Sequence, residues 1–107
     1  MVKPLRESQI EAYGKKRAEA AGGVVRKVKW VGRTAAPDRV LMLPEWCKPI
    51  RFGFLEMPGE TIWVEFKAPG KKPTAAQLRE HERMRAVGQT VLVWDSIEAI
   101  DRWFEGR

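Results

Sequence analysis

One short stretch of the chain places an acid and a base side by side. The stretch Ile62-Trp63-Val64-Glu65-Phe66-Lys67 is an apolar run of β-branched and aromatic residues that carries two charges at its end. Such a run is typical of a buried strand, and side chains alternate between the two faces of a strand. Glu65 and Lys67 therefore point to one face, and Val64 and Phe66 point to the other. Because an uncompensated buried charge is costly, the pair predicts a site for chemistry at this strand end.

Further acidic residues can supply oxygen ligands to the same site. Asp38 begins another expected strand, and Glu11 lies on an expected first helix, one turn after Glu7. A hard divalent cation such as Mg²⁺ takes oxygen ligands and is commonly held by one or two carboxylates, with waters and substrate phosphate completing its shell. Asp38 and Glu65 would be those carboxylates, with Glu11 as a third. The backbone carbonyl of Phe66 would add another oxygen.

Basic and amide side chains have complementary roles around such an ion. Lys67 would orient or activate an attacking water, or stabilise the charge that develops on a phosphate. Gln77 has two readings, because it completes a capping box that begins at Thr74 or contacts the metal site or the phosphate. The side chains expected to contact flanking phosphates are those of Lys27, Lys29, Arg33, Lys71 and Lys72.

Helix formers, β-branched runs and turn residues predict the elements that position these side chains. Helices are expected over residues 5–21, 74–87 and 97–104, and strands over residues 24–31, 38–43, 61–67 and 89–94. Residues 45–49 read as irregular, residues 50–57 as a further strand or a hairpin arm, and residues 58–60 as a turn. A helix between the last two strands favours a parallel pair. The order α-β-β-β-α-β-α predicts one α/β domain over residues 1–107, with a mixed central sheet flanked by helices.

The expected helix over residues 74–87 has an assignable inner and outer face. Its apolar residues Leu78, Met84 and Val87 are expected to point inward. The charged run from Arg79 to Arg83 reads as the solvated face of the helix. His81 lies within that run and is expected at the surface rather than as a metal ligand.

The composition favours an acidic partner. The chain has 107 residues, of which 20 are Lys or Arg and 14 are Asp or Glu, so the formal net charge is +6. This excess favours nucleic acid, although a generically basic soluble protein has the same signature. The single cysteine, Cys47, excludes an internal disulfide, suits a reducing cytoplasm and, with a single histidine, argues against a zinc site. Neither a signal peptide nor a membrane span is expected.

The motifs follow one another in a family-specific order. They are Ile10-Glu11, Gly22-Gly23, Pro37-Asp38-Arg39, the segment from Val64 to Gly70, and a helix that contains Gln77. Together they resemble the VRR-NUC domain family of the PD-(D/E)xK nuclease superfamily. The resemblance implies a restriction-endonuclease-like fold and a Mg²⁺- or Mn²⁺-dependent endonuclease that acts on DNA. It implies that Asp38 and Glu65 are metal ligands, that Lys67 is the catalytic lysine and that Glu11 is the first-helix acid, while Gln77 matches a family glutamine.

The resemblance also bears on substrate and assembly. A stand-alone domain of this length is similar to the phage and bacterial members, which resemble homodimeric Holliday-junction resolvases. It implies branched DNA as substrate, a homodimer, and the cytoplasm of a bacterial or phage-infected cell. The segment from Leu43 to Glu60 is longer than the usual hairpin of the family, and its Trp, Phe and Pro residues suit a dimer arm or a substrate contact.

Alternatives remain open at the level of the sequence. Glu11 is preferred to Glu7 because it follows Ile10 and precedes Gly22 at the family spacing. One metal ion or two would suit the acids. A non-catalytic DNA-binding module would use the same basic charge, and a nuclease that needs a partner protein is a third reading.

Overall fold

Three helices and six strands follow one another in the computed structural model, which describes residues 3–107. They are α1 (Glu7–Ala20), β1 (Val24–Lys27), β2 (Arg39–Leu43), β3 (Trp46–Ile50), β4 (Gly53–Met57), β5 (Glu60–Phe66), α2 (Ala75–Ala86), β6 (Thr90–Trp94) and α3 (Ile97–Glu105). None of these helices has the length and apolar character that crossing a bilayer requires.

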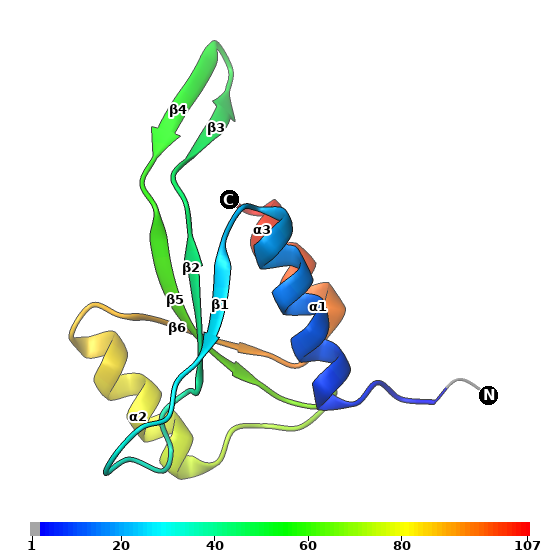
Figure 1. Ribbon diagram of the computed structural model, residues 1–107, viewed down its shortest axis with the longest axis vertical. Coiled ribbons are helices and arrows are strands. Elements are labelled where there is room, and N and C mark those ends of the chain that lie inside the picture. Colours follow the sequence, from blue (N-terminus) through cyan, green and yellow to red (C-terminus); the bar gives the residue numbers. More distant parts are fainter. Residues whose placement is uncertain (1–2) are drawn as a thin grey trace.

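A four-stranded mixed sheet forms the centre of the molecule. Its strand order is β1-β2-β5-β6; the first two pairings are antiparallel, and β5 and β6 run parallel. Helices α1 and α3 cover one face of the sheet, and α2 lies on the other (Figure 1). The α/β class, the mixed sheet and the parallel pair expected from the sequence are confirmed. The main core lies on the α1 and α3 face, where Ile10, Leu41, Ile62, Val64 and Ile100 are fully buried.

Small residues let α1 approach the sheet closely. Ala18 is fully buried, and a Cβ atom built on Gly14 would lie 2.8 Å from the ring of Phe66. Only a glycine therefore fits between this turn of the helix and β5 without a shift. The register of α1 against the sheet is set at this contact.

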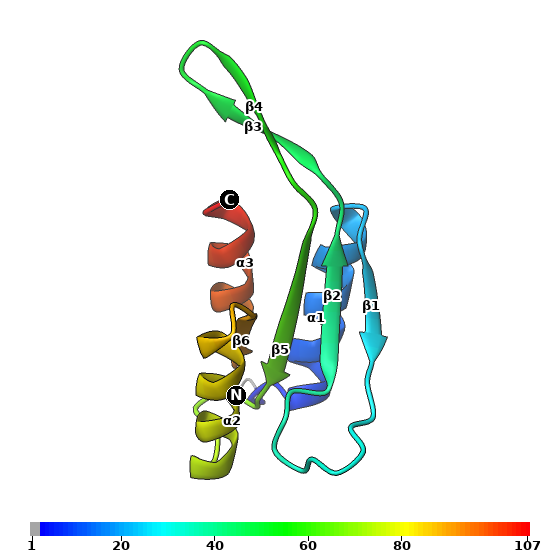
Figure 2. The same ribbon diagram turned by 90° about the vertical axis from the view of Figure 1, so that its left-hand side faces the viewer.

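Strands β3 and β4 form a hairpin arm that continues two strands of the sheet. Leu43 pairs with Glu60 in the sheet, and Trp46 pairs with Met57 in the arm, so one antiparallel register runs through both. Pro44 interrupts the ladder because it lacks an N–H group. Figures 1 and 2 show the arm extending well beyond the sheet and helices.

Two expectations for this segment are wrong. Residues 45–49 are not irregular, since 46–49 belong to β3, and residues 58–60 are not a turn, since β4 leads directly into β5. The proline and glycine signals mark breaks in the ladder rather than a reversal of the chain. The reversal occurs at Arg51 and Phe52 instead, between the two strands of the arm.

Helix α2 presents a different face to the sheet from the one expected. His81 is fully buried and Glu80 nearly so, whereas Val87 is 77% exposed and Leu78 is about half exposed. The buried stripe runs through His81 and Met84, positions that are neighbours on one face of a helix. The expected solvated face is therefore wrong for Glu80 and His81. The inward prediction is confirmed for Met84 and wrong for Leu78 and Val87, because polar residues fill part of the inner face.

Candidate functional site

The strand pairing brings Asp38 and Glu65 to one place. Arg39 pairs with Val64 in the antiparallel ladder between β2 and β5, so one further step in this register sets Asp38 opposite Glu65. The backbone N–H of Val28 donates to the Asp38 carbonyl at 2.8 Å, which extends the pairing of β1 and β2 to this point. Residues opposite each other share a face. Both carboxylates therefore lie on the face that α2 covers.

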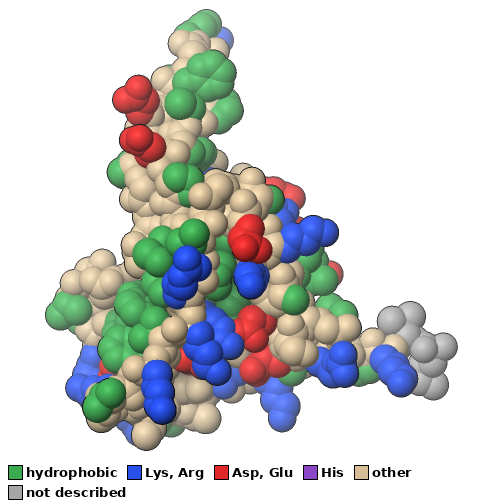
Figure 3. All heavy atoms as spheres, in the orientation of Figure 1, with side chains coloured by type: hydrophobic (Ala, Val, Ile, Leu, Met, Phe, Trp, Pro, Cys, Tyr) green, Lys and Arg blue, Asp and Glu red, His purple; other side chains and the backbone are tan. Residues whose placement is uncertain are grey.

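A groove of about 720 Å³ opens over these two acids. It gathers Asp38, Glu65 and Gln77 with three of the five basic residues expected to contact phosphate, namely Lys27, Lys29 and Arg33. Lys71 and Lys72 lie in the exposed loop after β5, outside the groove lining. On the face drawn in Figure 3, Lys and Arg side chains gather over the sheet and helices and are sparse on the arm. The groove combines anionic and cationic groups, as a site for a metal ion and a phosphate requires.

Among residues 3–107, the carboxyl group of Glu65 forms no hydrogen bond with a Lys or Arg side chain. Its Oε1 atom is buried and has no hydrogen-bond partner among the described residues. The pKa of Glu65 is raised from 4.5 to about 7, chiefly by burial; Lys67 opposes this rise, and Asp38 and Glu7 add to it. A divalent cation between Glu65 and Asp38 would offset both the burial and the repulsion between the acids. The site thus fits an oxygen-seeking ion such as Mg²⁺ or Mn²⁺.

Protein side chains supply only part of a coordination shell. Within residues 3–107, no three His, Cys, Asp or Glu side chains converge closely enough to hold a metal ion. The expected meeting of Glu11, Asp38 and Glu65 at one point does not occur in the described residues. An ion held here would depend on water and substrate phosphate for its remaining ligands, which is usual for Mg²⁺.

The two first-helix acids have different surroundings. Glu11 pairs with Arg39, and the Arg39 guanidinium lies 3.2 Å from the Asp38 carboxylate. Arg39 shares the α1 face with Val64, so Glu11 reaches Asp38 only through Arg39. Glu7, one turn earlier, contributes directly to the electrostatic field at Glu65. Helix α1 therefore brings Glu7 rather than Glu11 into the electrostatic surroundings of Glu65.

A tryptophan pair anchors the loop that leads to Asp38. The Trp30 indole N–H donates to the carbonyl of Pro37 at 2.8 Å, and its ring packs on Trp63 of β5 at 5.2 Å. Pro37 is fully buried. The chain just before Asp38 is thus fixed to the sheet, which limits the positions that the Asp38 carboxylate can take.

Helix α2 contributes one acid that the sequence did not single out. Glu80 is nearly buried and lies 3.8 Å from Arg33 and 2.9 Å from Arg83. It holds the Arg33 guanidinium near the groove. No local pattern marks Glu80, because it stands in a run of alternating charge that resembles a solvated helix face.

Gln77 serves the helix and lines the groove. The Gln77 side-chain oxygen Oε1 accepts a hydrogen bond from the Thr74 backbone N–H at 2.9 Å. The Gln77 backbone N–H donates to Thr74 Oγ1 at 3.1 Å. The capping box expected from the sequence is therefore confirmed. The side-chain amide nitrogen of Gln77, Nε2, has no role in this box and can donate to a ligand in the groove.

The remaining site residues lie at the end of β5. The Phe66 side chain is buried in the core, so only its backbone carbonyl can serve as a ligand. The Lys67 backbone N–H donates to the carbonyl of Trp94 at 3.0 Å, which extends the parallel pairing past the acid. The Lys67 side chain is half-buried.

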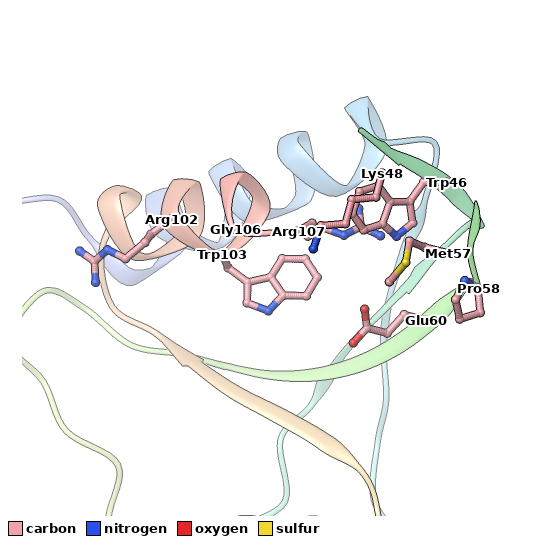
Figure 4. A pocket seen from close by; sticks show the side chains of 10 residues that line it. Trp46, Lys48, Met57, Pro58, Glu60, Arg102, Trp103, Gly106 and Arg107 are labelled. Atoms are coloured by element: carbon pink, nitrogen blue, oxygen red, sulfur yellow. The ribbon is translucent and has the colours of Figure 1, made fainter. Parts of the chain in front are cut away.

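A second cavity, of about 670 Å³, lies at the root of the arm (Figure 4). The guanidinium of Arg107 stacks on Trp46 of the arm at 4.4 Å and on Trp103 of α3 at 5.4 Å. Glu60 is the one acid in its lining, at the opposite end of β5 from Glu65. This cavity is therefore separate from the site of Asp38 and Glu65. Beside it, the stacked Arg107 side chain links the arm to α3.

Comparison with known proteins shows that this chain is similar to a phage protein and to a solved structure. "Putative nuclease p44" of Acyrthosiphon pisum secondary endosymbiont phage 1 is 40% identical over 92 residues, which cover 86% of this chain and 85% of that protein. A solved structure named "VRR_NUC domain" is 39% identical, covers 92% of this chain and 94% of its own, and superposes with a TM-score of 0.74. No protein-family model matches the chain. The resemblance inferred from the motifs is confirmed by the relative and by the solved structure.

Proposed function

Because the chain belongs to the VRR-NUC family of nucleases and has its restriction-endonuclease-like fold, we propose that it is a metal-dependent DNA endonuclease. The groove that contains Asp38 and Glu65 is its active site in this proposal. One observation carries it: Asp38, directly before β2, lies in one groove with Glu65 of β5, and Oε1 of the buried Glu65 has no hydrogen-bond partner among the described residues. The basic side chains at the same groove suit a phosphate backbone.

Each residue of the groove has a defined role in hydrolysis. Asp38, Glu65 and the Phe66 carbonyl would hold Mg²⁺ or Mn²⁺, which when bound stabilises phosphate charge and lowers the pKa of a bound water. Lys67 follows Glu65 by two residues, so its side chain leaves the strand on the same face. From there it orients the attacking water and donates hydrogen bonds to the phosphate. The water oxygen forms a bond to phosphorus and its proton goes to solvent, while the P–O bond to the leaving sugar oxygen breaks and that oxygen takes up a proton from solvent.

Further residues around the groove orient these groups or bind the phosphate backbone. Glu11 holds Arg39, and Arg39 in turn contacts Asp38, so this pair orients the Asp38 carboxylate. Gln77 offers its amide nitrogen to a phosphate oxygen in the groove. Lys27, Lys29 and Arg33 bind phosphates on either side of the cleaved bond, and Lys71 and Lys72 extend this contact beyond the groove.

The test is cleavage of labelled DNA. A four-way junction, a flap and a duplex are incubated with the protein in Mg²⁺, in Mn²⁺ and in EDTA. Lys67→Ala and Asp38→Asn are each expected to lower the cleavage rate by about 100-fold or more, since each removes a group that acts on the transition state. Lys48→Ala is the matched control, because Lys48 lies on the arm at the second cavity. Cleavage by both site variants at the wild-type rate would falsify the assignment.

The same assay separates the alternative readings. Metal-independent binding with no cleavage of any structure would indicate a non-catalytic DNA-binding module. Cleavage that appears only after a host or phage protein is added would indicate a partner-dependent nuclease. Glu7→Gln and Glu11→Gln, compared side by side, identify which first-helix acid the rate depends on.

For the substrate, we propose branched DNA such as a four-way junction, cut by a homodimer in the cytoplasm. Resolving a junction requires two incisions, and a two-fold dimer presents two equal sites. The arm offers a surface for such pairing, since Phe52 is 86% exposed and Phe54 is 72% exposed. The charged side chains of the arm segment have no net charge, because the two acids Glu45 and Glu56 balance the two bases Lys48 and Arg51. An apolar surface without excess positive charge suits a second copy of the chain better than it suits DNA.

Light scattering across micromolar concentrations tests the dimer. The wild-type chain is expected at twice the mass of one chain, and the double variant Phe52→Ser/Phe54→Ser is expected at the mass of one. Leu78→Ser is the control, because Leu78 is half-exposed on α2, away from the arm. A wild-type chain that stays monomeric throughout this range would contradict the dimer.

A further inference from the structure

The one histidine of the chain is buried and, within residues 3–107, has no hydrogen-bond partner. His81 lies on the inner face of α2 and is fully buried. Neither of its ring nitrogens has a hydrogen-bond partner among the described residues. An unpaired polar group inside a protein costs stability that an apolar side chain of similar size would not. A position with only a packing role would favour such an apolar residue.

The nearest acid to this imidazole is Glu65. His81 Nε2 lies 3.5 Å from Glu65 Oε1, the same oxygen that lacks a partner. A shift of about half an ångström would bring the two atoms to ordinary hydrogen-bond distance. Among the described residues, both atoms are unsatisfied and buried, and they lie next to each other between α2 and β5.

The surroundings favour a neutral imidazole that donates one hydrogen bond. Burial lowers the pKa of His81, and Arg85 and Lys67 lower it further, against the opposite effect of Glu80 and Glu82. A neutral imidazole has one N–H donor and one acceptor. A carboxylate accepts only, so the N–H would reside on Nε2.

We propose that His81 is a positioning residue for Glu65, and that its Nε2–H holds Oε1 of the carboxylate so that Oε2 faces the groove. The inference rests on the proposed function, because it takes Glu65 as a ligand of the divalent cation. Ligands of metal ions are commonly oriented by a hydrogen bond to a second residue. Helix α2 would thus contribute to the site through His81 on its inner face, which contacts Glu65 and does not touch the substrate.

Three substitutions distinguish a positioning role from a packing role. His81→Gln places an amide nitrogen near the position of Nε2, whereas His81→Asn places one only near Nδ1. His81→Leu removes every donor. Met84→Leu is the control, since Met84 is a buried neighbour on the same face of α2.

The readout is the affinity for Mn²⁺ without DNA, measured by calorimetry on variants whose fold is checked by urea unfolding. The Leu and Asn variants are expected to bind Mn²⁺ about 10- to 100-fold more weakly than wild type. The Gln and Met84→Leu variants are expected to bind nearly as the wild type does. With diamagnetic Mg²⁺ bound, so that Glu65 is ionised, nitrogen NMR of the wild-type imidazole is expected to show the proton on Nε2.

Each other outcome overturns the inference in a distinguishable way. Wild-type affinity in a folded His81→Leu chain would reduce His81 to a packing role. If that variant does not fold, equal affinity in the Gln and Asn variants has the same meaning. If Glu65→Ala binds Mn²⁺ as tightly as wild type, or if the wild-type chain binds none, the metal role of Glu65 fails and this inference fails with it. Loss of binding in Glu65→Ala with none in His81→Leu overturns this inference alone.

Discussion

At the scale of single residues, the candidate site contains a carboxyl group, that of Glu65, whose surroundings disfavour its ionised form. Glu65 is buried, faces Asp38 across the ladder, and lies in the field of Glu7. Without a cation, this arrangement favours the protonated form of the acid. The same features that destabilise an ionised Glu65 in the metal-free protein would strengthen its binding to a divalent ion.

The protonation of Glu65 makes the stability of the metal-free protein depend on pH. Its pKa rises from 4.5 in the unfolded chain to about 7 in the folded one, so the folded state binds the proton more tightly. The associated stabilisation is full below pH 4.5 and is lost as the pH rises through 7. A shift of this size corresponds to about 3 kcal/mol.

Urea unfolding of wild type and Glu65→Gln in EDTA measures this effect. Because Gln mimics the protonated acid, the two proteins should be equally stable near pH 4.5. The Gln variant should be more stable by about 3 kcal/mol at pH 8. Glu82→Gln, at an exposed position of α2, should show no such divergence. A difference between wild type and Glu65→Gln that does not vary with pH would refute the assigned pKa.

At the scale of the elements, the site is built by how closely they approach. The register of β2 on β5 places Asp38 next to Glu65. Trp30 holds the backbone just before Asp38 through its hydrogen bond to Pro37. On the other side, His81 of α2 covers Glu65. Helix α1 is held against β5 at Gly14, where the Phe66 ring leaves no space for a side chain. Phe66 directly follows Glu65, so this contact also supports the strand at the site.

Gly14→Ala tests this close approach. An alanine in a helix gains about 1 kcal/mol over glycine from propensity alone. The added methyl group would instead lie 2.8 Å from Phe66, whose ring is packed against Trp94. Overpacking of this kind costs about 1–3 kcal/mol, so we expect a net loss of stability in urea unfolding. The double variant Gly14→Ala/Phe66→Leu should recover part of the loss, and a Gly14→Ala chain more stable than wild type would contradict the contact.

At the scale of the whole molecule, positive charge and apolar surface lie in different places. The net charge is +6, and basic residues line the groove, whereas the arm carries exposed aromatic residues and balanced charges. DNA binding and self-association can therefore use separate surfaces. A dimer joined through the arms would keep both grooves open to a branched substrate.

Salt dependence measures how far DNA contacts extend. In EDTA, the logarithm of the affinity should fall linearly with the logarithm of the salt concentration, because each phosphate contact releases counterions. Lys27→Ala and Lys71→Ala should each make this slope shallower by about 1. Lys48→Ala, at the second cavity, should leave the slope unchanged. Equal slopes for Lys27→Ala and Lys48→Ala would place the DNA elsewhere.

Local chemistry made much of this protein predictable from the sequence. The strand that carries Glu65 and Lys67, the capping box at Thr74 and the glycine after α2 each depend on residues close together in the chain. Strand alternation is equally local, so the opposite faces of Glu65 and Val64 followed from it. The order of the motifs identified the family, because that order does not depend on how the elements pack.

Only the tertiary structure decided which residues meet. It paired Asp38 with Glu65, turned Glu11 toward Arg39, and buried His81 against Glu65. Each of these outcomes depends on the register between strands or the rotation of a helix against the sheet, and both are set by contacts between distant parts of the chain. For α2 the reason is specific: its buried face carries polar residues, and an apolar pattern cannot reveal a polar face that a neighbouring site requires.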